Sequence, residues 1–589
     1  MLSLRLPVVG FTRLGKRPRP WAVSFSSSVP DRDENHDTTS MNPYNTNRNA
    51  IDAKQVYRYL GLETFQEPEL RSAFQSIKRT GKANTSNETA MDPNDISPSD
   101  LEAFLEEKIK TMEGVNGYMN KHDMDTTVKL RRQFVAMEAK RCWDFLRLKV
   151  VEKSNGTLSV DEFCSAVKSS ASSLDTKRIL PMTVAMILVG SSVGVVTPVM
   201  PFVVQNLGLT AGEYGLVVSA FALSKMTGNI PSAVLVERHG RKPYLVYSLI
   251  GIAFGVGGVG FAGSFEELYL CRLATGMCVA SLSAAVTMTV TDISTPLNRA
   301  SSFAPVMSGF AAGTALGPAL GGILCDQIGI NPTFYIVGVS YVVLAAVNNS
   351  LLNETQPKAM TFPWQKPPQS AAPPPTIVES FQSALGQWVP LLSMAPVRNL
   401  CIMNGFYWMG LAGSQMTLLP LILTNADGLA MSATNVGQVY MGMSLVQVLG
   451  NPIMAKVVDN VGKLPGIVGG CTLISLAMAT LPFCTETSEL AGVLGVWALG
   501  SSLLSTSPIS YISDKVDDKK RAQAIALLRT SGDVGFLLGA SSMGALADWI
   551  GSLEVAMQSS SGILLAATSW FTVRNFLYTQ VEAESKDPL

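Results

Sequence analysis

The sequence has few charges for its length and no excess of either sign. Only 15% of its 589 residues are Asp, Glu, Lys or Arg, and 45 basic residues balance 45 acidic ones. A soluble globular chain usually carries about 25% charged residues, so this composition argues against a wholly soluble protein. The zero net charge provides no global field for nucleic acid, and we expect no nucleic-acid partner.

Residues that carry catalytic or metal chemistry are also sparse. The three histidines are scattered, which excludes a histidine relay within a membrane, and the eight cysteines contain no CxxC pair. Neither a zinc site nor a disulfide framework is indicated. No phosphate-binding P-loop is present, and no nucleophile clusters with a base at a recognisable spacing. We therefore expect no enzyme, no ATP-driven pump and no cofactor.

Long apolar runs are abundant, and the mean hydropathy is +0.25. Twelve runs approach or exceed the ~20 residues that a helix needs to cross a bilayer. The first six are Ile179–Val204, Tyr214–Val236, Tyr244–Ala262, Leu268–Val290, Phe303–Leu324 and Phe334–Leu352. The second six are Leu400–Leu423, Val436–Val458, Leu464–Leu481, Leu490–Ile512, Ala522–Leu546 and Val555–Phe571.

An internal repeat relates the two sets at an offset of 222 residues, which carries Gly215 onto Gly437. The same offset matches Gly228 with Gly450, Asn229 with Asn451, Glu237 with Asp459, Gly240 with Gly462, Pro198 with Pro420, Asp292 with Asp514, Arg299 with Arg521, Gly313 with Gly535 and Gly317 with Gly539. We predict an all-α integral membrane fold of 12 transmembrane helices in two six-helix pseudo-repeats.

The expected domain order follows from these spans. A six-helix bundle over 179–352 precedes a Pro-rich linker over 353–390, a second bundle over 391–577 and a tail over 578–589. Within the linker, Ile377–Leu391 has the pattern of an amphipathic helix at the membrane interface.

Lysine and arginine mark one side of the membrane. The loops after spans 1, 3, 5, 7, 9 and 11 contain neither residue, whereas the loops after spans 2, 4, 6, 8 and 10 hold many. We call these the cation-free and cation-rich sides. By the positive-inside rule, both termini and the cation-rich loops lie on the cytosolic or matrix side.

The N-terminus has the composition of an organellar transit peptide. Residues 1–30 contain five basic residues and no acid, with apolar patches too short for a secretory signal, and residues 31–50 are polar and expected to be disordered. The alternative is a basic disordered tail. We expect the mitochondrial inner membrane, with the plasma membrane, vacuole and plastid as alternatives.

Residues 51–175 form an expected soluble helical segment, with helices over Glu67–Lys78, Ser99–Thr111, Val128–Val151 and Val160–Ser170. Residues 95–101 and 155–163 resemble the second halves of EF-hand loops, with Gly156 at the turn and Glu162 at the bidentate position. Val151 and Lys153 fall at ligand positions and cannot bind calcium. We predict a degenerate EF-hand-like pair for packing or a protein partner, with Glu162 as a weak calcium candidate.

The loop between spans 2 and 3 completes a recognisable pattern. Together with the repeat, it resembles the major facilitator superfamily, whose signature at this place is G-x-x-x-D-R-x-G-R-K/R, although Glu replaces Asp and Ala233 replaces the leading Gly. The resemblance implies a charge latch that holds the halves together. Its residues are Glu237, Arg238, Gly240, Arg241, Lys242, Asp292 and Asp459.

Within that latch, the resemblance implies that Glu237 meets the positive end of helix 11. It also implies that Arg238 pairs with Asp292 at the end of helix 4. Helix-end charges of this kind contribute ~1 kcal/mol or more when partly buried. The alternative is that the loop cations only fix topology.

The fifth span resembles the G-x-x-x-G-P-x-x-G-G signature of the drug/proton antiporter branches. The matching residues are Gly313, Gly317, Pro318, Gly321 and Gly322. The resemblance implies multidrug efflux by exchange, and ordinary packing of small residues is the alternative for Gly313 and Gly317 alone.

Charges within spans cost several kcal/mol unless paired or hydrated, so they mark candidate substrate or coupling residues. They are Lys225, Arg272, Arg529 and Asp533. Lys225 lies near mid-span and suits an anionic or polar group of the substrate, while Arg529 and Asp533 are also spaced for a simple i,i+4 pair. Candidates for proton coupling are Glu213, Glu237, Asp292 and Asp533.

These observations predict a monomeric secondary active transporter of a small molecule, driven by a proton gradient. It alternates access by rocking two halves around a site near the bilayer midplane. The alternative is a transporter-like sensor or scaffold that signals through residues 51–175.

Overall fold

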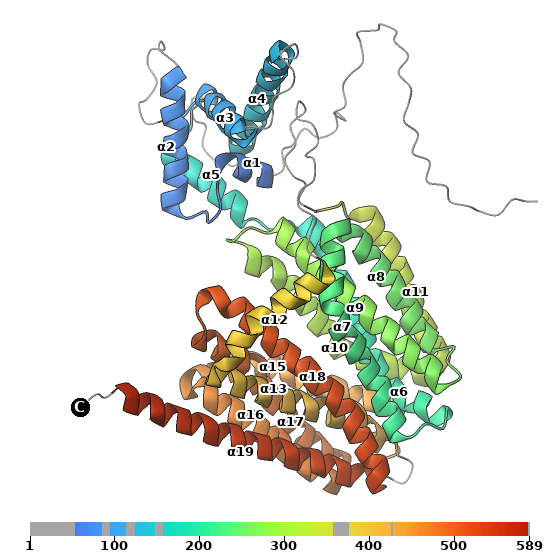
Figure 1. Ribbon diagram of the computed structural model, residues 1–589. Helices are drawn as coiled ribbons and strands as arrows, with labels where there is room; N and C mark the ends of the chain where they lie inside the picture. Colours follow the sequence, from blue (N-terminus) through green and yellow to red (C-terminus); the bar gives the residue numbers. More distant parts are fainter. Residues whose placement is uncertain are drawn as a thin grey trace, which may run out of the picture. The chain divides into compact units, whose positions relative to one another are not determined.

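The computed structural model describes residues 53–84, 95–113, 124–147, 157–356, 376–425 and 428–586 (Figure 1). All of these belong to one compact unit that begins at Ile51. The transit-peptide prediction over residues 1–30 lies outside the described residues.

Four of the first five helices overlap the helices expected over residues 51–175, and α1 has no counterpart in that prediction. The five are α1 (Ala53–Leu60), α2 (Glu67–Asn84), α3 (Pro98–Glu113), α4 (Met124–Arg147) and α5 (Val160–Ser172). Their apolar faces share one core, which includes Leu70, Phe74, Leu105 and Phe163. Helix propensity alone is marginal at these lengths, so this shared core supplies most of the stability.

Two short backbone segments pair ahead of α3 and α5. Ile96 and Leu158 exchange N–H···O bonds of 2.9 and 3.0 Å. Glu162 is engaged locally, because its carboxylate accepts the Ser159 N–H at 2.8 Å in a capping box. No metal-ligand cluster occurs among the described residues. Gly156, Val151 and Lys153 lie outside them, and the EF-hand-like pair stays a prediction.

Two sets of long helices follow. The first is α6 (Thr176–Asn206), α7 (Ala211–His239), α8 (Arg241–Val259), α9 (Phe265–Ile293), α10 (Arg299–Ile328) and α11 (Ile330–Leu351). After α12 (Ile377–Ser393), the second begins with α13 (Ala395–Gly410), which continues through a π-helical segment, η2 (Leu411–Leu418), into α14 (Leu419–Thr424). It ends with α15 (Ala433–Val461), α16 (Lys463–Thr480), the 3₁₀ turn η3 (Leu481–Phe483), α17 (Thr487–Lys515), α18 (Asp518–Ile550) and α19 (Leu553–Lys586).

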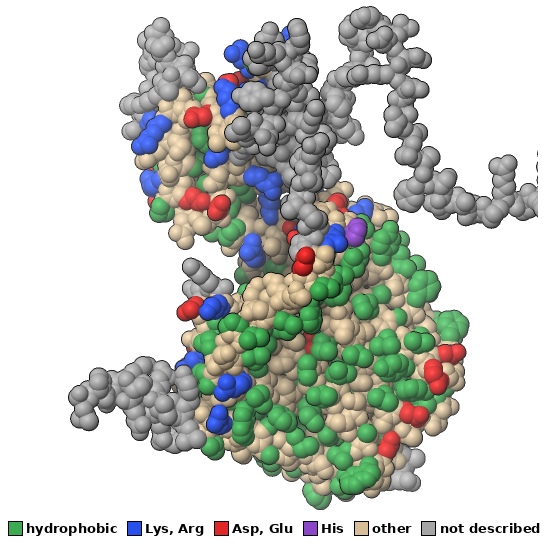
Figure 2. Space-filling view, viewed as in Figure 1, with side chains coloured by type: hydrophobic (Ala, Val, Ile, Leu, Met, Phe, Trp, Pro, Cys, Tyr) green, Lys and Arg blue, Asp and Glu red, His purple; other side chains and the backbone are tan. Residues whose placement is uncertain are grey.

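Nine helical segments in the described part of the chain are long and apolar enough to cross a membrane. The other three expected spans coincide with α7, α18 and α19, so the count of twelve stays a prediction. Charged residues within α7 and α18 lower their hydropathy. Apolar side chains cover the exposed face of the two halves in Figure 2, as expected for a surface in contact with lipid.

The 222-residue repeat is visible in the backbone. Gly240 and Gly462 end α7 and α15 with φ of 106° and 107°, and Gly329 and Gly551 end α10 and α18 with φ of 93° and 75°. A residue that has a Cβ atom rarely adopts these backbone angles, which explains why glycine occurs at both members of each pair.

Each half has its own apolar core, and the halves meet along α7–α18 and α10–α15. Glycines allow the helix backbones to approach closely there. A Cβ on Gly215 would lie 2.2 Å from the Ala540 carbonyl oxygen, and one on Gly437 would lie 2.3 Å from that of Pro318. Small residues at such crossings are how helices associate in a membrane.

Candidate functional site

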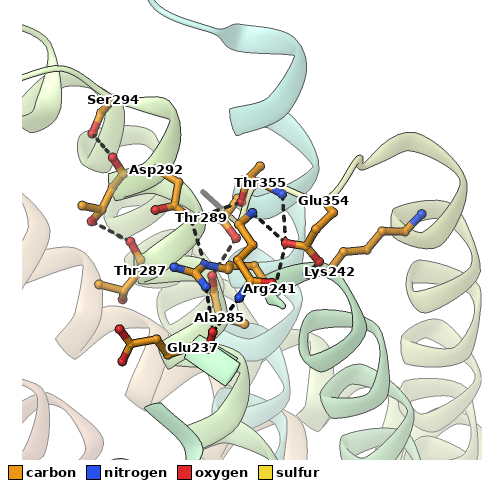
Figure 3. A network of polar contacts seen from close by, with 12 residues as sticks. Glu237, Arg241, Lys242, Ala285, Thr287, Thr289, Asp292, Ser294, Glu354 and Thr355 are labelled. Carbon is orange, nitrogen blue, oxygen red and sulfur yellow. Dashed lines mark hydrogen bonds and ion pairs between the residues drawn. The ribbon is translucent and has the colours of Figure 1, made fainter. Parts of the chain in front are cut away.

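A buried ion pair lies at the cation-rich ends of α8 and α9 (Figure 3). Arg241 Nε donates to Asp292 Oδ2 at 2.8 Å, and the two side chains are only 10% and 12% exposed. Arg241 Nη1 also donates to the Glu237 carbonyl oxygen at 3.3 Å. A charge pair this enclosed interacts more strongly than an exposed one, and leaving either partner unpaired is costly.

Glu354, which follows α11, ties the linker to the same place. Its carboxylate accepts the backbone N–H groups of Arg241 at 2.9 Å and Lys242 at 3.1 Å, the first residues of α8. Burial alone would raise the pKa of Glu354, but the N–H groups of Arg241, Gln356, Lys242 and Thr355 together hold its pKa below the ordinary value. We keep the name latch for Arg241, Asp292 and Glu354. All three lie in the first half or directly after α11, so their contacts do not join the two halves as the resemblance implied.

The latch differs in detail from the sequence prediction. Arg241, not the expected Arg238, is the cation that the structure pairs with Asp292. The Glu237 side chain is exposed and, among the described residues, is assigned no hydrogen bond to α18, although its carbonyl accepts Gln356 Nε2 at 2.7 Å. Lys242 contributes its backbone N–H, and Asp459 is exposed on α15.

The second half repeats the ion pair. Lys463 Nζ meets Asp514 Oδ2, and the 222-residue offset carries Arg241 onto Lys463 and Asp292 onto Asp514. These side chains are 31% and 57% exposed, so solvent screens the pair much more than its counterpart. The first half therefore contains the stronger copy.

A second ion pair joins the two halves within the membrane. Lys225, near the middle of α7, lies 3.2 Å from Asp533 Oδ1, near the middle of α18. The side chains remain 33% and 25% exposed, so the pair is accessible to small solutes or water. The structure thus brings together two of the four charges singled out in the sequence.

The other two charges lie apart from this pair. The Arg272 guanidinium sits over the Phe221 ring, 5.4 Å from its centroid, and its buried Nε has no hydrogen-bond partner among the described residues. Arg529 is exposed on α18. Asp533 forms its ion pair with Lys225, and not the i,i+4 pair with Arg529 that the sequence left open as the alternative.

The glycine signature of α10 forms two close contacts. Added Cβ atoms at Gly313 and Gly317 would lie 2.1 and 2.4 Å from carbonyl oxygens of α6, and one at Gly321 would lie 2.6 Å from a Cα of α6. Gly322 instead faces the other half, 2.2 Å from the Ala433 carbonyl oxygen of α15. One string of small residues therefore packs both within a half and between halves.

Two carboxylates close the cation-free side. Asp548, at the end of α18, accepts the N–H groups of Ala211 at 3.1 Å and Gly212 at 2.8 Å, the first residues of α7. Asp326, at the end of α10, accepts the Thr434 N–H at 2.9 Å at the start of α15. Each carboxylate satisfies orphan donors and the positive end of a helix in the other half.

We call Asp326 and Asp548 the far-side caps. The sequence prediction did not include them, although the 222-residue offset carries Asp326 onto Asp548 and was a signal that could have identified the pair. Glu354 was also missed, and its repeat counterpart is Phe576, so no periodic signal marks it.

The π-helical segment η2 adds another contact between the halves. Its wider turn frees backbone carbonyls from the helix, and Tyr214 Oη of α7 donates to the Met416 carbonyl oxygen at 3.1 Å. Gln205 Nε2 reaches Thr424 Oγ1 at 3.3 Å nearby. The arrangement is closed on the cation-free side by residues of both halves.

Two repeat-related helical halves, with an ion pair between them at mid-membrane and caps on one side only, define a multi-pass membrane transporter. The family model of the Major Facilitator Superfamily matches residues 182–540 and 400–587. The chain belongs to this superfamily, whose members move solutes without transforming them. It is a transporter, not an enzyme, and binds small-molecule substrates within a lipid bilayer.

Three relatives illustrate the similarity. An uncharacterized MFS-type transporter of Methanocaldococcus jannaschii, MJ1560, is 26% identical over 61% of this chain and 88% of its own length. The quinolone resistance protein NorA of Staphylococcus aureus is 31% identical over 32% of this chain and 48% of its own. The multi-drug resistance efflux pump PmrA of Streptococcus pneumoniae is 30% identical over 27% and 41%. The matched region spans less than half of NorA and of PmrA.

Solved structures confirm the fold. A bacterial homolog to the human lysosomal transporter Spinster, in an inward-facing and occupied conformation, superposes with a TM-score of 0.55 and 16% identity, covering 67% of this chain and 96% of the other. A point mutant of the nucleoside transporter NupG gives a TM-score of 0.56 with 12% identity, covering 67% and 99%.

Proposed function

We propose that the protein is a proton-coupled antiporter that exports a small amphipathic or polar solute bearing an anionic group. The observation that carries this proposal is the Lys225–Asp533 ion pair, which lies near mid-helix and links the halves. Substrate and coupling-ion sites of secondary transporters lie near the bilayer midplane between their repeats.

The pair has no copy in the repeat, which supports a role beyond architecture. The offset carries Lys225 onto Gln447 and carries Ala311 onto Asp533, and a glutamine and an alanine cannot form an ion pair. The Arg241–Asp292 pair, in contrast, has a copy. Structural contacts that each half requires are expected in both halves. A single central site between the halves requires its charged groups only once.

The chemistry of coupling follows from the cost of an unpaired charge within a membrane. Separating α7 from α18 during the transport cycle would leave Lys225 and Asp533 unpaired, at a cost of several kcal/mol. On the leg of the cycle without substrate, a proton on Asp533 removes the charge of the carboxylate. On the opposite leg that proton has left, and the anionic group of the substrate binds beside Lys225. Because proton and substrate occupy the pair on opposite legs, they exchange at one pair.

Arg272 provides a second cation for the same task. Its buried Nε lacks an acceptor among the described residues, and a buried donor without a partner is costly. An anionic substrate group that satisfied it would gain a charge-assisted hydrogen bond. We propose that Arg272 contributes to substrate recognition after Lys225 has released Asp533.

Alternating access requires that the far-side caps open when the latch side closes. In the closed state, Asp548 and Asp326 hold the starts of α7 and α15 against the other half. The expected contact of Glu237 with the start of α18 then belongs to the opposite state of the cycle. The export direction is supported by the glycine signature and by the names of two relatives, a resistance protein and an efflux pump.

The test uses the full chain in liposomes with an internal pH-sensitive dye and an imposed proton gradient. Small amphipathic anions are loaded into the lumen one at a time, and the wild type is expected to bring protons into the lumen only while a transported solute leaves it. Lys225→Ala and Asp533→Asn should abolish this coupled flux. The control is Lys456→Ala, which removes an exposed lysine from α15. Coupled flux at the wild-type rate in both pair variants would refute the proposal.

We also propose that both termini face the cytosol or matrix and that residues 1–30 direct the chain to the mitochondrial inner membrane. A C-terminally tagged full chain is expected to colocalise with mitochondria and to lose that signal when residues 1–30 are removed. Plasma-membrane or vacuolar signal that the truncation leaves unchanged would refute the targeting role.

A further inference from the structure

An apolar groove runs between α13 and α18 and is bordered at its cation-rich end by α12. It encloses about 420 Å³. Most of its lining residues form one stripe on each helix, from Arg398 to Met409 on α13 and from Leu527 to Leu538 on α18. In each stripe, the lining residues lie 3, 4, 7, 8 and 11 positions after the first one. Eleven residues of helix span about 16 Å, which is half of the ~30 Å hydrocarbon core. The groove therefore has the depth of one leaflet.

The groove opens to the lipid and not to the interface between the halves. Val534 and Leu538 line it and are exposed. Asp533 and Ala540, which meet α7, lie on another face of the helix. The groove is thus separate from the ion pair proposed above as the transport site.

The lining hydroxyls of Thr530 and Ser531 donate to carbonyls of their own helix, and the other polar groups described here lie at the cation-rich end. Arg398, in the first turn of α13, has a guanidinium whose assigned hydrogen bond is a long one, 3.5 Å to the Leu392 carbonyl oxygen. No ion pair is assigned to it within the described ranges. The indole Nε1 of Trp388, on α12, is buried with no acceptor among the same residues. Both groups donate, so this end of the groove suits a negatively charged acceptor.

The position of these donors matches that of a lipid headgroup. Helix α12 contacts α7, α13 and α18 (Figure 1). It exposes apolar residues such as Val378, Phe381 and Val389, as an interfacial amphipathic helix does. Tryptophan and arginine are favoured at headgroup level, where arginine binds phosphate. An apolar trough one leaflet deep with donors at its outer end is complementary to a phospholipid.

We infer that the groove binds one acyl chain of an anionic phospholipid from the leaflet on the cation-rich side, with its phosphate against Arg398. This inference depends on insertion in a membrane and does not depend on the proposed transport cycle. The lipid fills the space among α12, α13 and α18 and so connects the linker to the second half.

The test measures phospholipid retained by the purified full chain in native mass spectrometry and its thermal stabilisation by phosphatidylglycerol against phosphatidylcholine. Gly405→Leu fills the groove, because a Cβ there meets only the Ser531 carbonyl at 3.5 Å, an ordinary contact. The matched control is Gly562→Leu on the exposed face of α19, where a Cβ meets nothing within 4 Å.

The wild type should retain one phospholipid through purification and prefer phosphatidylglycerol. Gly405→Leu should lose that lipid, and Gly562→Leu should keep it. Arg398→Gln should reduce the preference for the anionic lipid about fivefold, as expected for one basic residue near the surface. Lys515→Gln, on the same side, should leave it unchanged. Equal retention by Gly405→Leu and the wild type would overturn the inference, as would displacement of the lipid by a transported solute.

Discussion

The far-side caps give the sharpest prediction, because they are repeat-related and join the halves on one side only. Replacing Asp326 and Asp548 by alanine removes the acceptors for N–H groups that begin α15 and α7. The closed cation-free side is then expected to open in a larger fraction of molecules. The contacts of Tyr214 and Gln205 remain, so a shift in population is expected and not a loss of fold.

The magnitude follows from the value of a helix cap. Loss of an acidic N-cap costs ~1 kcal/mol, and the interaction of a carboxylate with a helix N-terminus falls in the same range for partly exposed groups. Each substitution should change the closed-to-open ratio about fivefold. The caps lie on different helix pairs, so their effects should add to ~2 kcal/mol, or about 30-fold.

Double electron–electron resonance on spin-labelled full chain measures this ratio. Phe261 and Phe483 are exposed, repeat-related positions on the cation-free side of opposite halves, so Phe261→Cys and Phe483→Cys provide the two labels. Cys484 is replaced by serine to avoid a neighbouring label. The cap double variant should move the distance distribution toward longer separations.

A matched control uses the same chemistry within each half. Glu267 and Glu489 are also repeat-related, and their carboxylates accept the N–H groups of Gly263 at 2.8 Å and Thr485 at 3.0 Å in their own halves. Their double alanine variant should leave the distance between the halves unchanged. A cap double variant with the wild-type distribution would show that the caps do not hold the halves together.

Three further predictions concern stability. In thermal unfolding of the detergent-purified chain, Arg241→Ala should lower the free energy of unfolding by ~3–5 kcal/mol, because its ion pair is buried. Lys463→Ala should lower it by ~1 kcal/mol or less, because solvent screens that pair. Equal losses in the two variants would contradict this reasoning. The ionised Glu354 carboxylate gives its full stabilisation above the ordinary pKa of 4.5, and this stabilisation is lost as pH falls through the lowered pKa of the folded state. The difference in unfolding free energy between wild type and Glu354→Gln should therefore shrink below pH 4.5. A difference that stays constant with pH in chemical unfolding would contradict this. Gly313→Val should prevent recovery of monodisperse protein in size-exclusion chromatography, because its Cβ would lie 2.1 Å from a carbonyl of α6, whereas Gly442→Val has open space.

The architecture was predictable because membranes restrict the choices. Apolar runs of bilayer length must form helices, and the repeat paired them across the chain. The helix expected over Ile377–Leu391 is present as α12, where a capping box at Thr376 and Glu379 starts the helix after the proline run. The mean hydropathy of α7 lies below that of the nine apolar segments, because Lys225 and the charges at the ends of the helix lower it.

The identity of contacting partners was harder to predict than the identity of the important residues. Lys225 and Asp533 were selected separately, each as a costly charge in a span, but sequence gives no register between α7 and α18. Arg238 and Arg241 are three residues apart, about one helical turn, and only the C-cap at Gly240 decides which one turns toward Asp292. Glycine with φ of 106° reverses the chain there, so Arg241 begins a new helix and points back.

The repeat distinguishes features that occur in both halves from charged residues that occur only once. The Arg241–Asp292 pair, the far-side caps and the glycines that end α7 and α15 all occur twice, as expected for parts that any six-helix half needs. The four charges singled out within the spans have no charged counterpart in the repeat. Lys225, Arg272, Arg529 and Asp533 correspond to Gln447, Leu494, Met307 and Ala311. Since an intramembrane charge is costly and the duplicated framework does not repeat these charges, their presence in one half only supports the central charge-binding site proposed above.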